Sequence, residues 1–136
     1  MRKAIGYSLT ELLTVILIVG MLAAVAIPLM RGRVDSAKWS EGKARAGTIA
    51  TAIRAWIAGY NKPGSWTNAL GSLDARELGF GKKDLDGKYF TKDNFTWVVN
   101  YDGENLQYSI TITKPYPSWK PDQMVLDTGV WQEHGL

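Results

Sequence analysis

Residues 6–28 read GYSLTELLTVILIVGMLAAVAIP, and this stretch decides the fold of the chain. From Leu12 to Met30 the sequence carries no charge and consists mainly of Leu, Ile, Val, Ala and Met. A helix rises about 1.5 Å per residue, so a run of this length nearly spans the ~30 Å hydrocarbon core of a bilayer. We therefore predict a membrane-spanning helix over residues 7–30.

Charges flank this apolar run in an informative pattern. Arg2 and Lys3 precede it, Arg31 and Arg33 follow it, and a lone acid, Glu11, lies at its N-terminal edge. A carboxylate at the edge of hydrocarbon is costly, and ionisable residues in such positions usually serve a function. The sequence therefore marks Glu11 as a candidate functional residue.

Two simple interpretations of the run leave this acid unexplained. A secretory signal peptide has a basic start, an apolar stretch and a small-residue cleavage site, for which Ala24-Val25-Ala26 could serve. The run is long for such a peptide, however, and an acid at its head is unexpected. A plain membrane anchor fits the length but assigns no role to Glu11.

The start of the run also resembles a known processing signal. Gly6 followed by Tyr7-Ser8-Leu9-Thr10-Glu11 closely resembles the prepilin signal of type IV pilins and of the pseudopilins of secretion systems. The resemblance implies that a prepilin peptidase of the inner membrane cuts after Gly6, removes residues 1–6 as a leader, and methylates the new amino group of Tyr7. The family usually has Phe at this position, so Tyr7 is a departure that keeps the aromatic ring.

Two further positions match the family. Glu11 falls at the fifth mature position, where the family carries its glutamate, and the resemblance implies a role for it in assembly. Pro28 matches the proline that kinks the N-terminal helix of the family. Major pseudopilins usually carry an acidic calcium loop near the C-terminus; Asp122 and Asp127 are present here without the Gly-rich acidic pattern around them.

The resemblance also implies partners and a location. The partners would be identical or related pilin subunits in a helical homopolymer, the prepilin peptidase and the assembly platform of the inner membrane. The precursor would be a single-pass protein of the bacterial inner membrane. After assembly the subunit would lie in an extracellular pilus or a periplasmic pseudopilus.

The composition agrees with a membrane leader followed by one domain. The chain has 136 residues and a net charge of +3, from 16 bases and 13 acids. Loss of residues 1–6 removes Arg2 and Lys3 and leaves 14 bases against 13 acids. The basicity is therefore largely a topology signal, and we predict no specific nucleic-acid partner. The chain has no cysteine, so the C-terminal disulfide of many pilins is absent.

Beyond Pro28 the helical pattern resumes and becomes amphipathic. Apolar residues recur at three- and four-residue steps at Ala46, Ile49, Ala50, Ile53, Ile57 and Tyr60. We predict one long helix over about residues 8–59, kinked near Pro28 because a proline inside a helix removes a hydrogen bond and clashes with the preceding turn. A globular domain over residues 31–136 would begin with the helical segment 31–59.

Residues 60–94 are predicted to form a connecting loop. Asn61–Ser65 indicates a turn, and Ser72–Gly79 a short helix capped by Ser72 and ended by Gly79. The fragment Asp84-x-Asp86-Gly87 resembles part of a calcium loop but lacks the later ligands. A solvated turn is favoured there, and we predict no cofactor and no metal site; calcium is the alternative, which no clear motif supports.

Residues 95–136 change to the two-residue period of a sheet. Phe95–Tyr101 and Leu106–Thr113 alternate apolar and polar residues around the hairpin signal Asp102–Asn105, and Met124–Leu126 and Gly129–Trp131 are further strand candidates. A three- or four-stranded antiparallel sheet packed on the second half of the helix gives an α+β fold, with Trp131 as a last core residue. The pilin resemblance implies the same fold.

Residues capable of catalysis are scarce. The single histidine, His134, is predicted to be a solvated tail residue, and no phosphate loop, nucleophile motif or paired metal ligands are present. The loop Pro115–Pro121 is either a binding or subunit-contact surface or a rigid crossover between strands. We predict that the protein is not an enzyme but the structural subunit of a type IV pilus-like filament. A pseudopilin of a type II secretion system, or a minor pilin, remains the alternative.

Overall fold

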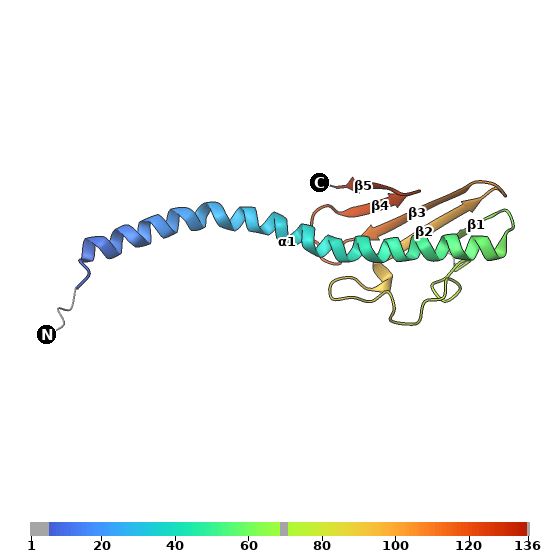
Figure 1. Ribbon diagram of the computed structural model, residues 1–136, viewed down its shortest axis with the longest axis horizontal. Helices are drawn as coiled ribbons and strands as arrows, with labels where there is room; N and C mark the ends of the chain where they lie inside the picture. Colours follow the sequence, from blue (N-terminus) through green and yellow to red (C-terminus); the bar gives the residue numbers. More distant parts are fainter. Residues whose placement is uncertain (1–5, 69–70, 136) are drawn as a thin grey trace. The chain divides into compact units, whose positions relative to one another are not determined.

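The computed structural model describes residues 6–68 and 71–135, so residues 1–5 of the predicted leader lie outside the described part. The described residues form one long helix and five strands (Figure 1). These elements are α1 (Leu9–Tyr60), β1 (Gly64–Thr67), the short 3₁₀ helix η1 (Lys92–Asn94), β2 (Phe95–Tyr101), β3 (Leu106–Thr113), β4 (Gln123–Asp127) and β5 (Val130–His134). The predicted α+β class is confirmed.

Helix α1 matches the predicted span of residues 8–59 to within one residue at each end. It continues through Pro28 without a break, and the kink at this residue stays a prediction. The chain divides inside α1 into two compact units, and the second begins at Ala37. The predicted boundary between the membrane-spanning segment and the globular domain, between residues 30 and 31, lies inside the first of these units.

The sheet is an antiparallel meander in the order β1-β2-β3-β4-β5. The sheet has five strands, one more than the upper limit of the prediction. The additional strand is β1, which was predicted to be part of a turn and the connecting loop. Its four residues pair with the end of β2, from Gly64 opposite Tyr101 to Thr67 opposite Val98. A segment this short, with Gly and Ser in it, has too little alternation to identify a strand. Backbone pairing along the edge of β2 outweighs these weak preferences.

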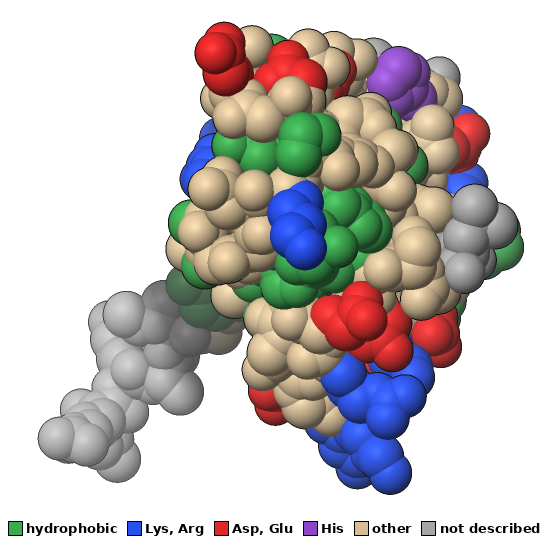
Figure 2. Space-filling view, turned by 90° about the vertical axis from the view of Figure 1, so that its right-hand side faces the viewer, with side chains coloured by type: hydrophobic (Ala, Val, Ile, Leu, Met, Phe, Trp, Pro, Cys, Tyr) green, Lys and Arg blue, Asp and Glu red, His purple; other side chains and the backbone are tan. Residues whose placement is uncertain are grey.

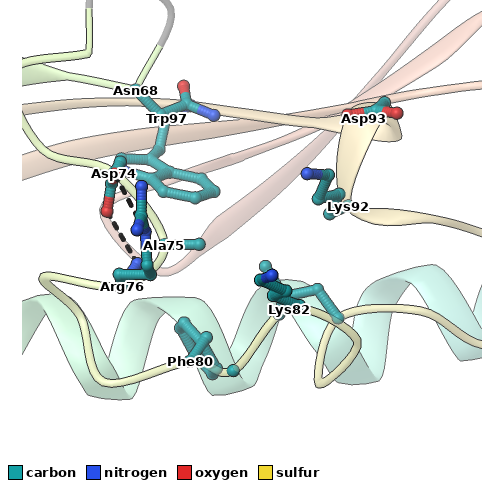
Figure 3. A pocket seen from close by; sticks show the side chains of 11 residues that line it. Asn68, Asp74, Ala75, Arg76, Phe80, Lys82, Lys92, Asp93 and Trp97 are labelled. Atoms are coloured by element: carbon teal, nitrogen blue, oxygen red, sulfur yellow. Dashed lines mark hydrogen bonds and ion pairs between the residues drawn. The ribbon is translucent and has the colours of Figure 1, made fainter.

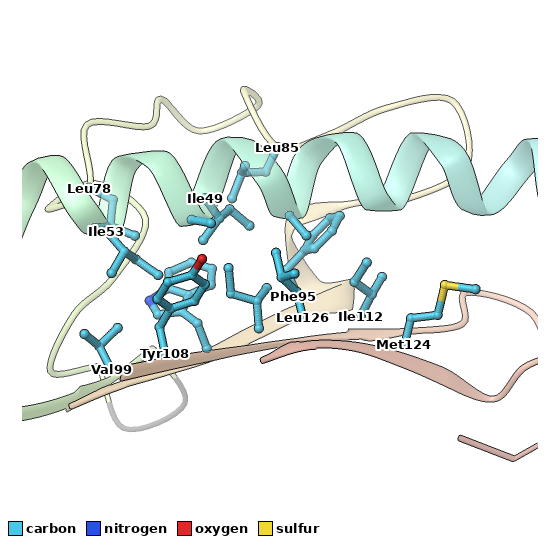
Figure 4. Packing of buried hydrophobic residues seen from close by; sticks show 14 of the residues in the cluster. Ile49, Ile53, Leu78, Leu85, Phe95, Val99, Tyr108, Ile112, Met124 and Leu126 are labelled. Atoms are coloured by element: carbon cyan, nitrogen blue, oxygen red, sulfur yellow. The ribbon is translucent and has the colours of Figure 1, made fainter. Parts of the chain in front are cut away.

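The core lies between α1 and the inner face of the sheet (Figure 4). The predicted stripe is buried from Ala46 to Ile57, whereas Tyr60 at its end is 46% exposed. The stripe also begins earlier than predicted, at Trp39 and Gly42. A Cβ at Gly42 would lie 3.1 Å from Cζ of Phe90, so the glycine lets this ring pack close to the helix.

The predicted helix over Ser72–Gly79 is wrong, because this segment forms only turns. Asp74, not Ser72, caps the local turn: the backbone N–H groups of Arg76 and Glu77 donate to Asp74 Oδ1 at 2.7 and 3.2 Å. The Ser72 hydroxyl is bound instead to the backbone of Thr67 in β1. Gly79 ends the turn as predicted, with a φ of +87°.

The loop from Pro115 to Pro121 is fixed against the helix. Trp119 is 5% exposed and its ring packs on Trp39 and Phe90 at centroid distances of 6.3 and 5.7 Å. The indole N–H of Trp39 donates to the carbonyl of Lys120 at 3.0 Å. The base of this loop is therefore fixed in place, as expected for a rigid crossover between strands.

The last strand departs in two ways from what the sequence suggested. Trp131 is only half-buried and packs at the margin of the core. His134 is exposed, as predicted, but it ends β5 and is not part of a free tail, because its carbonyl accepts a hydrogen bond from Asp122 N–H at 2.9 Å.

Ile53→Asp tests the helix–sheet contact. Ile53 has no exposed surface, so the substitution removes apolar burial and places an unpaired charge in the core. We expect a loss of about 3–5 kcal/mol in the free energy of unfolding, measured by urea denaturation of a chain that starts at Arg33. Ala55→Asp, at an exposed position of α1, is the matched control. Equal stability of the two variants would mean that this face of α1 is not buried in solution.

Candidate functional site

The segment before α1 presents the predicted cleavage site. Gly6 and Tyr7 precede the helix, lie in backbone without regular structure, and are exposed, Tyr7 to 78%. A Cβ built on Gly6 would meet no atom within 4 Å. The peptide bond between Gly6 and Tyr7 thus lies in exposed, non-helical backbone.

Glu11 is part of a capping box at the start of α1. The backbone N–H of Glu11 donates to Ser8 Oγ at 3.2 Å, and the backbone N–H of Ser8 donates to Glu11 Oε2 at 3.0 Å. Reciprocal bonds of this kind satisfy two N–H groups that the first helical turn leaves without partners. The sequence analysis missed this role, although the Ser8-x-x-Glu11 spacing is the signature of a capping box.

The cap holds the carboxylate of Glu11 beside the positive end of the helix dipole. Glu11 Oε2 is engaged by Ser8, whereas Glu11 Oε1 has no hydrogen bond to any residue that the structure describes. Tyr7 directly precedes Ser8, the residue that shares this cap with Glu11. Pro28 is not part of this group, since 17 residues of helix place it about 26 Å away along α1.

The first half of α1 exposes an unusually large apolar surface. It is long and apolar enough to cross a membrane, and none of that segment is buried. Each of its large apolar side chains is about half exposed or more. These residues are Leu9, Leu12, Leu13, Val15, Ile16, Leu17, Ile18, Val19, Met21, Leu22, Val25, Ile27, Leu29, Met30 and Val34. A surface of this kind requires lipid or another protein as its partner.

The two carboxylates of the acidic fragment Asp84–Gly87 accept hydrogen bonds from backbone N–H groups of nearby residues. Asp84 Oδ2 accepts the backbone N–H of Gly81 at 2.7 Å, and Asp86 Oδ1 accepts that of Lys92 at 2.9 Å. Among residues 6–68 and 71–135, no group of three or more His, Cys, Asp or Glu side chains is arranged to hold a metal ion.

Asp122, the other acid considered for calcium, is already bound by two ammonium groups. Its Oδ1 accepts from Lys114 Nζ and, at 3.3 Å, from Lys120 Nζ. The hydrogen bond from Lys114, followed by that from Lys120, lowers the pKa of the Asp122 carboxyl below its usual value. Lys114 Nζ also donates to the carbonyl of Pro117 at 2.9 Å, so its ammonium group joins this carbonyl to the Asp122 carboxylate.

A cleft of about 570 Å³ lies between the loop that follows β1, η1 and β2 (Figure 3). Its volume is within the range of ligand pockets. Arg76 on its rim pairs with Asp74 at 3.7 Å. The lining contains no hydroxyl, thiol or imidazole group that could act as a nucleophile. It consists of Asn68, Asp74, Ala75, Arg76, Phe80, Gly81, Lys82, Leu85, Lys92, Asp93 and Trp97.

Comparisons of the chain with models of known protein families, with curated proteins and with solved structures give no match. The features that bear on function are therefore the start of α1 and the apolar surface that follows it.

Proposed function

We propose that this protein is a structural subunit of a type IV pilus-like filament. In this proposal, a prepilin peptidase cuts the inner-membrane precursor after Gly6 and methylates the amino group of Tyr7. The observation that carries the proposal is the exposed apolar half of α1, which begins in a turn capped by Glu11 directly behind an exposed Gly6–Tyr7 bond. Neither a plain anchor nor a secretory signal needs this combination.

The exposed apolar surface explains how the same helix can lie in the membrane before assembly and in the filament core afterwards. Before assembly, lipid covers the segment from Leu12 to Met30. Extraction from the membrane would expose this surface to water unless it is buried again. A staggered bundle of identical helices buries it, so the core of the filament replaces the bilayer as its surroundings.

Glu11 would then control the register of assembly. Cleavage after Gly6 creates an amino group at Tyr7, of the same or a neighbouring subunit, that can pair with the carboxylate in the apolar core of the filament. A buried carboxylate without a partner costs several kcal/mol, so a subunit in the wrong register is rejected. Because this amine exists only after cleavage, assembly depends on processing.

The intact mass of the mature subunit tests the proposal. We expect sheared filaments to contain a chain that lacks residues 1–6 and carries one added methyl group, as measured by mass spectrometry. A subunit that retains Arg2 and Lys3 in filaments would contradict the assignment. So would a cut after Ala26, since that would make the segment a secretory signal.

The second candidate is a pseudopilin of a type II secretion system, and a minor pilin is the third. The bound state of Asp122 favours the pilus over a calcium-dependent major pseudopilin, because Lys114 and Lys120 already neutralise this carboxylate. No observation separates a major from a minor pilin.

Calcium addition distinguishes these candidates further. We expect the melting temperature of a chain that starts at Arg33 to be the same in millimolar Ca²⁺ and in EDTA, as measured by circular dichroism. The physical reason is that an ion would have to displace two ammonium groups from Asp122. A calcium-dependent rise in melting temperature of several degrees would favour the pseudopilin.

A further inference from the structure

The globular unit that begins at Ala37 carries an exposed aromatic surface at the C-terminal end of α1. The rings of Trp56 and Tyr60 stack at a centroid distance of 4.7 Å, and Trp66 of β1 meets both edge-on at 5.1 and 5.6 Å. We call these three residues the aromatic trio. Tyr60 remains 46% exposed, and Nζ of Lys62 lies 5.9 Å from the centre of its ring. Figure 2 shows hydrophobic side chains gathered on this end of the molecule with a basic side chain lying across them.

A second exposed aromatic surface is formed by residues 115–117, which we call the proline–tyrosine loop. Tyr116 is 55% exposed, and its ring packs at 5.5 Å on the buried ring of Trp119. The carbonyl of Pro117 accepts a hydrogen bond from Lys114 Nζ at 2.9 Å. The loop is thus held in shape while its aromatic side chain faces solvent.

The two surfaces lie at opposite ends of the unit. The base of the proline–tyrosine loop is bound to Trp39, whereas the aromatic trio begins at Trp56, 17 residues further along the same helix. At about 1.5 Å per residue, Trp39 and Trp56 are about 26 Å apart along the axis of α1. One copy therefore cannot bring its own surfaces together, whereas successive copies can.

The two surfaces are chemically complementary. Proline-containing segments of restricted conformation dock on aromatic side chains, and aromatic rings also pair with one another. The net charges around the two surfaces are also opposite in sign. The β2–β3 turn beside the aromatic trio carries Asp102 and Glu104, and Pro63 reaches this turn at Gly103. Near the proline–tyrosine loop, Lys38 lies 4.8 Å from the centre of the Trp119 ring, and Lys114 and Lys120 outnumber Asp122, the acid that both contact. At the aromatic trio, the two acids of the turn outnumber Lys62.

We propose that the proline–tyrosine loop of one copy docks on the aromatic trio of a second copy of this chain. The contact uses different surfaces on the two copies, and contacts of this kind repeat into open arrays when the rotation does not close. The inference rests on the proposed function, and it adds a second, polar-rimmed contact between globular units to the apolar contact between helices.

Disulfide cross-linking tests the contact in assembled filaments. The chain has no cysteine, so Lys62→Cys and Ser118→Cys together introduce the only two thiols and leave the Tyr116 ring in place. Both positions are exposed, and a disulfide forms only if the two Cα atoms come within about 7 Å of each other. After mild oxidation of sheared filaments, we expect a ladder of dimers and larger multimers on a non-reducing gel. Each single variant, and the pair Val98→Cys with Ser118→Cys, should give no ladder, because Val98 is exposed elsewhere on β2.

A second measurement covers the case in which the paired cysteines prevent assembly. Tyr116→Ala is expected to lower the yield of sheared filaments at least severalfold with cleavage intact, whereas Val98→Ala leaves the yield unchanged. Filaments that form without a ladder, or a normal filament yield from Tyr116→Ala, would overturn the contact and leave the proposed function standing. Absence of filaments from the unmodified chain would overturn the proposed function, and this inference with it.

Discussion

Gly6→Val is expected to leave residues 1–6 attached to the chain and to abolish filaments. A Cβ at Gly6 meets no atom within 4 Å, so the fold accommodates valine without a clash. The effect should therefore fall on the peptidase, which must bind this residue on the N-terminal side of the bond it cuts. Without cleavage the amino group of Tyr7 does not form, and Glu11 keeps its charge without a partner in the filament.

Gly32→Val is the matched control for this prediction. Gly32 also has open space around it, and it lies on α1 far from the cleavage site. We expect this control to be processed normally, with both variants compared by intact mass of the membrane-bound and sheared fractions. Normal cleavage of the Gly6→Val chain, or filaments built from uncleaved chains, would contradict the assigned processing site.

The elements that the sequence predicted well are those with a long, regular pattern. The apolar run and the stripe through Ile49 and Ile53 predicted α1 and its buried face, because a helix of many turns repeats its signal several times. The alternation in residues 95–113 predicted β2, β3 and the turn between them for the same reason.

The elements that it missed depend on contacts between distant residues. Strand β1 is stabilised by pairing with β2, more than 30 residues away, and its own four residues carry little signal. Trp119 is buried because it meets Trp39 and Phe90, which no local pattern reveals. At residues 72–79, Ser72 was predicted as the cap, whereas the structure caps the turn with Asp74. The proximity of Ser72 to Thr67 of β1 left the cap to Asp74.

The candidate site was located by sequence, but only one of its two physical roles was recognised. The charge of Glu11 was identified from its cost at the edge of an apolar helix. Its hydrogen bond to Ser8 is a local property of the helix start, and the Ser-x-x-Glu spacing would have predicted it. This second role matters because removal of the side chain changes both the charge and the cap.

Substitution of Glu11 is expected to prevent assembly while leaving the precursor in the membrane. Glu11→Ala removes the charge and the cap, and loss of the cap costs about 1 kcal/mol at the first turn. Glu11→Gln separates the two roles, because glutamine can complete a capping box but carries no charge. If the charge pairs with the Tyr7 amine, both variants should insert and be cleaved, and both should lose most of their incorporation into filaments.

Fractionation of cells into sheared filaments and membranes, with an antibody against the globular unit, measures this result. Loss of filaments in both variants with the membrane pool preserved would place the function in the charge. Loss in Glu11→Ala with normal yield in Glu11→Gln would assign it instead to the hydrogen bond between Ser8 and Glu11. Normal yield from both would show that neither role sets the register. We expect both variants to lose their filaments. Loss of the cap costs only about 1 kcal/mol, whereas burial of the Tyr7 amine without its carboxylate partner costs several kcal/mol.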